Sequence, residues 1–348
     1  APFEVAGVEY LYVTVSATGR VLRGWSPSLA RTIRSAAESV GVVHSHALWM
    51  VPGIYARRAA QACALPLVIS PRGMLDPWSL ARHGTKKRLA ALLYEGRNLR
   101  AARLLHATSE LEAESIRRYG LKQSIVVLPN GVDLPKEDHI PAREVLEKRF
   151  PQLRGKRWLL FMGRLDPKKG LDLLTALWRE LGPQFPQWHL LVAGPDISGF
   201  GAKLAGLVDA ESELRERTTF TGMLAGADKS AALAHSELFV LPTHGENFGL
   251  TVAESLAHGT PVVTTTAAPW ADLTRFDCGW WVLPEEGAIR SALEMAMNSP
   301  REALSRMGER GRAMVRDQFS WSSIAGRWVE VYRWLIEGGD QPPSVRGR

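Results

Sequence analysis

Cysteine is nearly absent from this chain of 348 residues, which contains only Cys63 and Cys278, far apart in the sequence. Two distant cysteines do not form a disulfide framework, and this usage is typical of a reducing cytoplasm. Apolar runs are short, and none approaches the roughly 20 residues that a membrane-spanning helix needs. No secretory signal is visible. We therefore expect a cytoplasmic protein without a membrane span, one that binds membranes, if at all, peripherally.

Two glycine- and aspartate-based motifs are also missing. No Gly-x-Gly-x-x-Gly run follows a strand, and a nicotinamide-dependent oxidoreductase would need one. The chain has no Asp-x-Asp pair either. The first absence argues against an oxidoreductase, although the sheet type that the sequence predicts hosts both oxidoreductases and transferases.

Positive charge is in excess, by +7, but only in the first part of the chain. Residues 1–152 hold 21 lysines and arginines against 13 acidic residues, whereas the remainder holds 22 against 23. A basic half indicates an anionic partner, either a phospholipid surface or nucleic acid, or a basic face that is merely solvated. The length predicts two domains.

The most informative stretch is residues 238–264. An apolar run, Leu238–Leu241, predicts a buried strand; a polar loop, a helical pattern closing at Gly259 and a second apolar run, Val262–Thr264, follow it. Strand, loop, helix and strand in this order build a parallel sheet, and such sheets bind ligands where strands end and helices begin. Unpaired N–H groups at that helix start attract anions or sugar hydroxyls.

Glu246 and Glu254 lie eight residues apart in this stretch. On one helix they would be about 12 Å apart along the axis, so they do not form the pair of a retaining glycosidase, whose carboxyl groups lie roughly 5 Å apart. Each carboxylate is expected to contact a different part of one extended ligand. The alternative is that Glu246 is a helix-start carboxylate and Glu254 a solvated helix residue.

A second cluster follows the strand Trp158–Met162. Arg164 and Lys169 flank a turn that leads into a helix, and with nearby N–H groups they would make a clamp for a diphosphate. The alternative places the lysine side chain in solvent.

The Glu-x7-Glu pattern with Phe248-Gly249-Leu250 inside it, together with Gly-Arg-x4-Lys-Gly at 163–170, resembles the retaining nucleotide-sugar glycosyltransferases of family four, or group 1 glycosyl transferases. The resemblance implies an α/β chain with the GT-B fold, in which two facing Rossmann-like domains with parallel sheets enclose an interdomain cleft. It also implies retention of anomeric configuration and transfer without a cofactor. Enzymes that bridge sugar nucleotides through a metal usually need an Asp-x-Asp pair, so the absence of one predicts metal-independent transfer.

The resemblance assigns catalytic roles to Arg164 and Lys169 at the diphosphate and to Glu246 at the sugar, with Glu254 on the ribose. The remaining residues expected at the donor, a UDP-, GDP- or ADP-sugar, are Gly163, Gly222, Met223, Asn247, Phe248, Gly249, Leu250 and Thr251.

On the acceptor side we expect His46, which ends one predicted strand of the first half, and Arg72, which lies in the loop after the next predicted strand. Many relatives have a histidine that contacts the transferred sugar where this chain has Arg72, so Arg72 departs from the pattern; a bidentate contact with a phosphate or an acidic acceptor would suit it. His44 and His46 could ligate zinc, but no third ligand has a recognisable spacing, so no metal site is expected.

The segment from Lys86 to Arg103 predicts a helix with a dense basic face. Such helices rest on anionic membranes, and no nucleic-acid-binding module is evident. A glycan or lipid-linked acceptor, and a role in polysaccharide or cell-surface glycan synthesis, would explain this charge.

The expected organisation is an acceptor domain at 1–150, a nucleotide-sugar domain at 151–320, a closing helix at 321–337 that crosses back to the first domain, and a disordered tail at 338–348. Relatives begin with a strand and a Gly-Gly loop that this sequence lacks, so we expect a truncated start. A catalytically degenerate transferase, serving as a membrane or partner binding module, is the alternative function.

Overall fold

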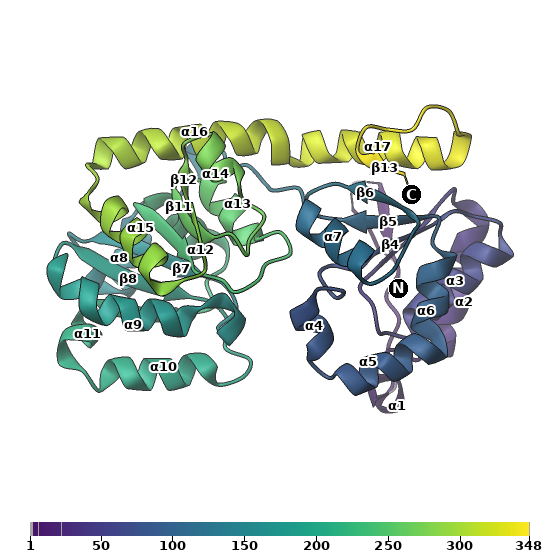
Figure 1. The fold of residues 1–348 in the computed structure, drawn as a ribbon, viewed down its shortest axis with the longest axis horizontal. Coiled ribbons are helices and arrows are strands. Elements are labelled where there is room, and N and C mark those ends of the chain that lie inside the picture. Colours follow the sequence, from purple (N-terminus) through teal and green to yellow (C-terminus); the bar gives the residue numbers. More distant parts are fainter. Residues whose placement is uncertain (1–2, 6, 22, 348) are drawn as a thin grey trace. The chain divides into compact units, whose positions relative to one another are not determined.

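The computed structural model of the chain describes residues 3–5, 7–21 and 23–347, which form two compact units (Figure 1). The first unit comprises Ala1–Pro129 and Ala325–Arg348, and the second comprises Asn130–Ile324. Each unit has its own sheet of mainly parallel strands with helices packed on it. The predicted α/β class with two parallel sheets is confirmed.

The boundary between the units lies about twenty residues before the predicted break at residue 150. Helix α8 (Glu144–Arg149) belongs to the second unit, because Leu146 is buried in that unit's core. Arg149 also forms an ion pair of 2.5 Å with Asp228 of the same unit. These contacts attach the segment expected to be a linker to the second unit.

The first unit contains a five-stranded sheet in the order β13-β6-β5-β4-β3. All neighbouring strands are parallel except β13, which is antiparallel to β6. The strands of the unit are β1 (Phe3–Val5), β2 (Val8–Tyr10), β3 (Val43–His46), β4 (Leu67–Ser70), β5 (Leu104–Ala107), β6 (Ser124–Val127) and β13 (Val345–Arg346). The helices are α1 (Ala17–Val21), α2 (Pro27–Ala36), α3 (Pro52–Ala62), α4 (Pro77–Ala81), α5 (Gly84–Ala90), the π-helix η2 (Ala91–Glu95), α6 (Gly96–Ala101), α7 (Glu110–Arg118) and most of α17 (Trp321–Glu337), which begins within the second unit.

Alternation along the strands gives this sheet two apolar faces. Leu67 and Ile69 of β4 pack with α3, α6 and α7 in one core, whereas Val68 packs on the other face with Val331 of α17. Because successive strand residues point to opposite faces, a strand that is apolar throughout must be covered on both. Helix α17 supplies the second cover and has the bounds predicted for the closing helix.

The last residues differ from the prediction of a disordered tail. Val345 pairs with Val126 as part of β13 and is 4% exposed, so the tail forms an edge strand of the first sheet. Its two-residue strand is too short to have an apolar pattern, which explains why the sequence did not predict it. Among the described residues, β1 and β2 pair only with each other.

The second unit contains a six-stranded parallel sheet in the order β12-β11-β10-β7-β8-β9. Its strands are β7 (Arg157–Met162), β8 (Trp188–Ala193), β9 (Thr218–Gly222), β10 (Leu238–Leu241), β11 (Val262–Thr265) and β12 (Gly279–Val282). Its other helices are α9 (Leu171–Leu181), α10 (Phe200–Asp209), α11 (Ser212–Glu216), α12 (Gly226–His235), α13 (Leu250–Ala257), α14 (Asp272–Arg275), α15 (Glu286–Asn298) and α16 (Arg301–Phe319).

The central strands of this sheet are apolar on both faces. Trp158, Leu159, Leu160 and Phe161 of β7 are wholly buried, as are the four residues of β10 apart from Leu241, which is 1% exposed. Continuous apolar runs of this kind are what a parallel sheet covered by helices on both faces requires. The central strands therefore offer few polar groups of their own, and the candidate site is built from the loops and helices that follow them.

Candidate functional site

The second sheet reverses its winding between β7 and β10. From β7 the chain proceeds outward to β8 and β9, then returns to the other side of β7 as β10 and continues to β11 and β12. Open parallel sheets bind ligands beyond the carboxyl ends of their strands at such a reversal. The loops that follow β7 and β10 are therefore where a ligand site is expected.

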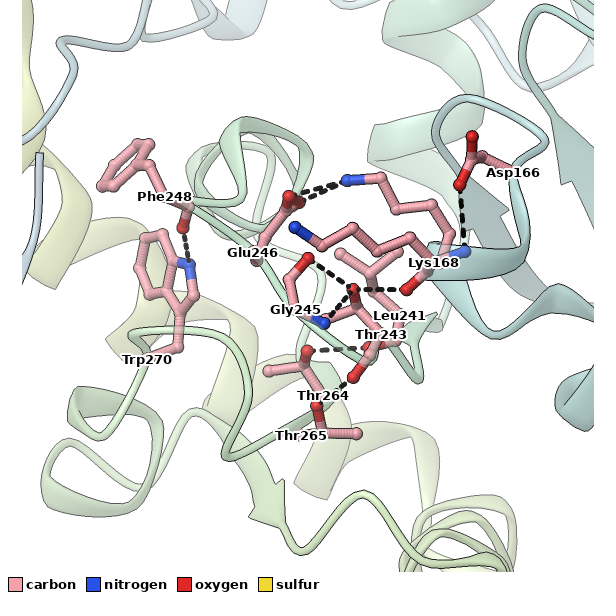
Figure 2. A network of polar contacts seen from close by, with 11 residues as sticks. Asp166, Lys168, Leu241, Thr243, Gly245, Glu246, Phe248, Thr264, Thr265 and Trp270 are labelled. Atoms are coloured by element: carbon pink, nitrogen blue, oxygen red, sulfur yellow. Dashed lines mark hydrogen bonds and ion pairs between the residues drawn. The ribbon is translucent and has the colours of Figure 1, made fainter. Parts of the chain in front are cut away.

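Buried hydroxyls fix the loop after β10 (Figure 2). Thr243 is wholly buried; its Oγ1 accepts the N–H of Gly245 at 3.2 Å and lies 3.0 Å from the carbonyl of Lys168. Thr265 Oγ1 donates to the carbonyl of Thr243 at 2.5 Å. The N–H of His244 also donates to the carbonyl of Lys168, at 2.8 Å. Because Lys168 lies in the loop after β7, these bonds hold the two loops together.

The loop after β7 carries the two predicted cations. Asp166 Oδ1 accepts the N–H of Lys168 at 3.0 Å and thereby begins the short 3-10 helix η5 (Pro167–Lys169). The Lys169 side chain is 12% exposed, whereas Arg164, one residue beyond Gly163 at the strand end, is exposed. Within the described ranges, Arg164 forms no ion pair. One cation is thus held in the structure and the other is available to a ligand.

An ion pair crosses the reversal point. Lys169 Nζ lies 2.7 Å from each carboxylate oxygen of Glu246, and the Glu246 side chain is 15% exposed. The N–H of Glu246 donates to the carbonyl of Ala267 at 2.9 Å, which fixes the start of its side chain. The structure therefore brings together two residues that the sequence places 77 positions apart.

The start of α13 is shaped by Gly249 and Phe248. Gly249 has φ +83°, a left-handed conformation that glycine adopts readily. The carbonyl of Phe248 accepts the Trp270 indole N–H at 2.5 Å, and its ring packs against Trp270 and Phe319. The Phe248 side chain thus belongs to the core, and only the backbone of this residue can contact a ligand. The N–H groups of Leu250 and Thr251 lie in the first turn, where a helix offers no internal acceptor; Asn247 precedes them.

Glu254 lies one helical turn further along α13. Its Oε1 forms an ion pair of 2.8 Å with Lys229 Nζ of α12, and its side chain is 19% exposed. Its Oε2 is buried and has no hydrogen-bond partner among the described residues. The alternative of a solvated helix residue is therefore wrong for Glu254. Lys229 was not predicted, since nothing in its own helix distinguishes it from a surface lysine.

Gly222 and Met223 end the outer strand β9. Gly222 has φ +72°, and its carbonyl accepts the N–H of Gly194 at 2.9 Å, while Met223 is 69% exposed. Strand β8 lies between them and β7. Within the described residues they make no hydrogen bond to the Lys169–Glu246 network, so their place at the ligand stays a prediction.

Polar residues also gather at the carboxyl ends of the first unit's strands. His44 and His46 of β3 stack with ring centroids 4.2 Å apart, which places them on one face as predicted. The Arg72 guanidinium donates to His46 Nδ1 at 3.2 Å. Arg72 has φ +56°, an uncommon conformation for a residue with a side chain. Its position is fixed by the neighbouring Gly73 N–H, which donates to the buried Glu112 at 2.6 Å.

A chain of hydrogen bonds runs beneath this pair and was not predicted. The His106 Nε2 proton goes to the carbonyl of Leu128 at 2.7 Å, so the neutral ring accepts at Nδ1 from the Ser70 hydroxyl, also at 2.7 Å. Ser70 then accepts from His44 Nε2 at 2.7 Å, and His44 Nδ1 accepts the Tyr332 hydroxyl at 2.6 Å. The Leu128 carbonyl can only accept, so it sets the direction of every hydrogen bond in this series. The Tyr332 hydroxyl connects α17 to the series.

Burial keeps these histidines neutral. Desolvation, aided by the neighbouring His46, His106 and Arg72, lowers the pKa of His44 to about 2. Burial likewise lowers the pKa of His106 to about 3, although the Leu128 carbonyl opposes the shift. The pKa of His46 is lowered by burial and then by Arg72. The histidine at this strand end therefore offers a neutral ring beside a cationic guanidinium.

The described part of the chain lacks two kinds of feature. No group of three or more histidine, cysteine, aspartate or glutamate side chains within it lies close enough together to hold a metal ion. Nor does any helix there combine the length and the apolar character needed to cross a membrane.

Comparisons with known proteins place the sequence. The family described as "Glycosyl transferases group 1" matches residues 143–314, and "Glycosyl transferase 4-like domain" matches residues 1–131. D-inositol 3-phosphate glycosyltransferase from Segniliparus rotundus is 27% identical over 318 residues, which cover 88% of this chain and 69% of that protein.

Solved structures share the fold. Sucrose-phosphate synthase from Thermosynechococcus elongatus matches with a TM-score of 0.72 at 20% identity, covering 97% of this chain and 86% of that one. Anabaena HepE in complex with UDP-glucose matches with a TM-score of 0.70 at 19% identity, covering 91% and 84%. At these identities the likeness concerns the fold alone.

Proposed function

The chain belongs to the group 1 glycosyl transferases and has their GT-B fold, and we propose that it transfers a sugar from a nucleotide-diphosphate donor with retention of anomeric configuration. The observation that carries this proposal is the pair formed by Lys169 and Glu246 across the reversal point of the second sheet. A partly buried cation and a partly buried carboxylate, with the exposed Arg164 in the same loop as Lys169, suit a ligand with a diphosphate and a sugar.

The donor's diphosphate is assigned to Arg164 and Lys169. Negative charge develops on the leaving diphosphate as the sugar departs, and preorganised cations stabilise that charge most in a partly desolvated site. Lys169 is positioned by η5 and by Glu246, so it needs no rearrangement to act. Arg164 has no ion pair to break within the described residues. Together they supply the electrostatic part of catalysis.

The sugar and the ribose are assigned to the two glutamates. Glu246 shares its carboxylate with Lys169, so a sugar hydroxyl donating to it would lie next to the diphosphate. The backbone N–H groups at the start of α13 would complete this end of the site. Glu254 Oε2 is buried without a partner in the described residues, and the two hydroxyls of a ribose would satisfy it.

Retention without a metal is part of the same proposal. We propose that the acceptor attacks the face from which the diphosphate departs and that a phosphate oxygen takes its proton. The protein then needs no general base, and its contribution is positioning and charge stabilisation. The absence of an Asp-x-Asp pair from the sequence supports a transfer that uses no metal bridge.

The acceptor is assigned to the first unit, at His46 and Arg72. The Arg72 guanidinium donates to His46 Nδ1 at the carboxyl ends of β3 and β4, so the neutral His46 ring carries its proton on Nε2. This N–H and the guanidinium suit a glycan hydroxyl or an anionic group on the acceptor. The excess positive charge of residues 1–152 supports peripheral association with an anionic membrane and a lipid-linked acceptor. Polysaccharide or cell-surface glycan synthesis is the setting that we propose.

A thermal-shift screen with UDP-, GDP- and ADP-sugars tests the donor site, because a ligand that binds only the native chain raises its melting temperature. We expect one donor class to stabilise the wild type and to be hydrolysed slowly. Lys169→Ala should lower hydrolysis by roughly 100-fold, the loss expected when one transition-state contact is removed. Lys203→Ala is the matched control, since Lys203 is an exposed lysine of α10.

Arg164→Ala distinguishes a loss of donor binding from the misfolding that Lys169→Ala could cause. Lys169→Ala leaves Glu246 without its cation, whereas Arg164 is exposed, so Arg164→Ala should keep the wild-type melting temperature while weakening donor binding. If neither the wild type nor either variant is stabilised by any donor or hydrolyses one, the proposal is contradicted. That result would favour a catalytically degenerate binding module.

A further inference from the structure

The first unit contains a cavity of about 380 Å³ that lies outside the site described above. Its apolar and aromatic lining includes Trp49, Leu80, Ala91 and Tyr119. This volume is within the range of pockets that hold small organic ligands. None of these residues belongs to the donor site or to the His46–Arg72 pair.

The charged residues of the cavity lining are both cations, Lys87 and Arg88. Lys87 Nζ donates to the carbonyl of Ser79, and neither cation forms an ion pair with a carboxylate in the ranges that the structure describes. Burial lowers the pKa of Lys87, and the nearby Arg23 and Arg82 lower it further, while Asp76 opposes them. An anion in this cavity would relieve that repulsion.

The helix that bears these cations has an unusual outer face. Gly84, Lys87, Arg88 and Ala91 recur at helical spacing and line the cavity along α5 and the start of η2. Its solvent-facing residues include Leu89, Leu92 and Leu93, which are 57%, 79% and 61% exposed. Three large apolar side chains on one exposed segment mark a surface that something apolar covers.

The π-helix η2 connects α5 to α6 and sets this arrangement. π-helices are rare and occur frequently at functional sites. Its last residue, Glu95, is 2% exposed and accepts the N–H of Trp49 at 2.8 Å. Trp49, which lines the cavity, has φ +65°, a conformation that costs free energy and is held in place by this contact.

We propose that this cavity binds the phosphate head group of an anionic membrane lipid, with Lys87 and Arg88 on the phosphate and the three leucines in the acyl layer. Cations inside a partly apolar cavity match a phosphate joined to a hydrocarbon, and the exposed leucines match the interior of the leaflet. The inference deepens the peripheral membrane association proposed above and gives it a specific lipid site.

Decyl phosphate is a soluble probe for this site. We expect it to bind the wild type in calorimetric titration, more tightly than inorganic phosphate does. Ala91→Phe, which places a ring in the cavity, should weaken decyl phosphate binding by roughly tenfold or more, equivalent to at least about 1.4 kcal/mol. Arg88→Ala should also weaken it, and because Arg88 is exposed this second variant should fold normally.

Lys122→Ala is the matched control for net charge, because Lys122 is an exposed lysine of the same unit that does not line the cavity. It should bind decyl phosphate as the wild type does. Wild-type binding by both Ala91→Phe and Arg88→Ala would overturn the proposal. Equal affinity for decyl phosphate and inorganic phosphate would also overturn it, since the site would then recognise a free phosphate.

Flotation with phosphatidylcholine vesicles, with and without phosphatidylglycerol, separates the lipid site from general electrostatic attraction. We expect the wild type to float with the anionic vesicles and Ala91→Phe to float less. Undiminished flotation of Ala91→Phe would overturn the lipid site while leaving peripheral association intact. Donor hydrolysis by Ala91→Phe should equal that of the wild type. Hydrolysis thus tests the transferase proposal, and flotation tests the lipid site independently of it.

Discussion

Gly170 lies so close to Pro242 that a side chain does not fit between them: a Cβ on residue 170 would lie 2.0 Å from the Pro242 carbonyl oxygen. Gly170 ends η5 with φ +70°, and Pro242 begins the loop after β10. This contact is where the two loops that carry Lys169 and Glu246 approach each other. Close packing of the backbones is therefore a condition for the ion pair.

Gly170→Ala should destabilise the chain by about 2–4 kcal/mol, the sum of a left-handed conformation for alanine and a backbone clash. Urea unfolding at constant pH measures this loss. Gly155→Ala is the matched control, because Gly155 has φ +69° but a Cβ there would have no neighbouring atom within 4 Å. Equal losses for the two variants would show that the contact with Pro242 is unimportant.

Much of the second unit could be predicted from the sequence, because its central strands β7 and β10 are mainly apolar and its candidate ligand-binding residues include several in the loops that follow them. Arg164 follows β7 at a distance of two residues, and Glu246 follows β10 at five. In a parallel sheet, residues with these positions come to the same edge wherever the strands are neighbours. The contact between Lys169 and Glu246 is a consequence of that rule.

The features that were missed join residues far apart in the sequence. His44 and Tyr332 are separated by 288 positions, and their contact depends on how α17 packs on the first sheet. Ser70 and His106 lie in strands whose other residues are apolar and buried, so the local sequence does not indicate a polar network there. The contact between Lys229 and Glu254 likewise depends on the packing of α12 on α13.

Acid should destabilise the chain through its buried histidines. The pKa of His44 is lowered to about 2 and that of His106 to about 3, from 6.5. The unfolded chain therefore takes up protons below pH 6.5 that the folded chain does not bind, so stability is complete above pH 6.5 and falls as the pH decreases. Each histidine contributes about 1.4 kcal/mol per pH unit, or roughly 4 kcal/mol for the two at pH 5.

Urea unfolding between pH 7 and pH 5 measures this slope. His106→Gln should flatten it, whereas His139→Gln should not, since His139 is exposed. Burial lowers the pKa of His189 to about 4, so this residue also contributes to the slope. Its contribution is the same in the wild type and in both variants, and it cancels in the comparison. An identical slope in His106→Gln and the wild type would contradict the assignment.

The direction of the hydrogen-bond chain leads to a prediction that stability alone does not test. Because His106 donates from Nε2 to a backbone carbonyl, and His44 donates from Nε2 to Ser70, both rings should be neutral with the proton on Nε2. Nitrogen-15 NMR distinguishes this tautomer from the other by the shifts of the two ring nitrogens.

Tyr332→Phe removes only the first donor of the chain. His44 Nδ1 then loses the hydroxyl that it accepts, while the bonds from His44 to Ser70 and from Ser70 to His106 persist. The ring nitrogen shifts of His44 should therefore change and those of His106 should stay, at a cost of about 1–3 kcal/mol for the unsatisfied nitrogen. Ser70→Ala should instead change both rings, because it removes the acceptor of one and the donor of the other. Unchanged His44 shifts in Tyr332→Phe would mean that Tyr332 does not donate to this ring, and α17 would then be held to the first sheet by apolar packing alone.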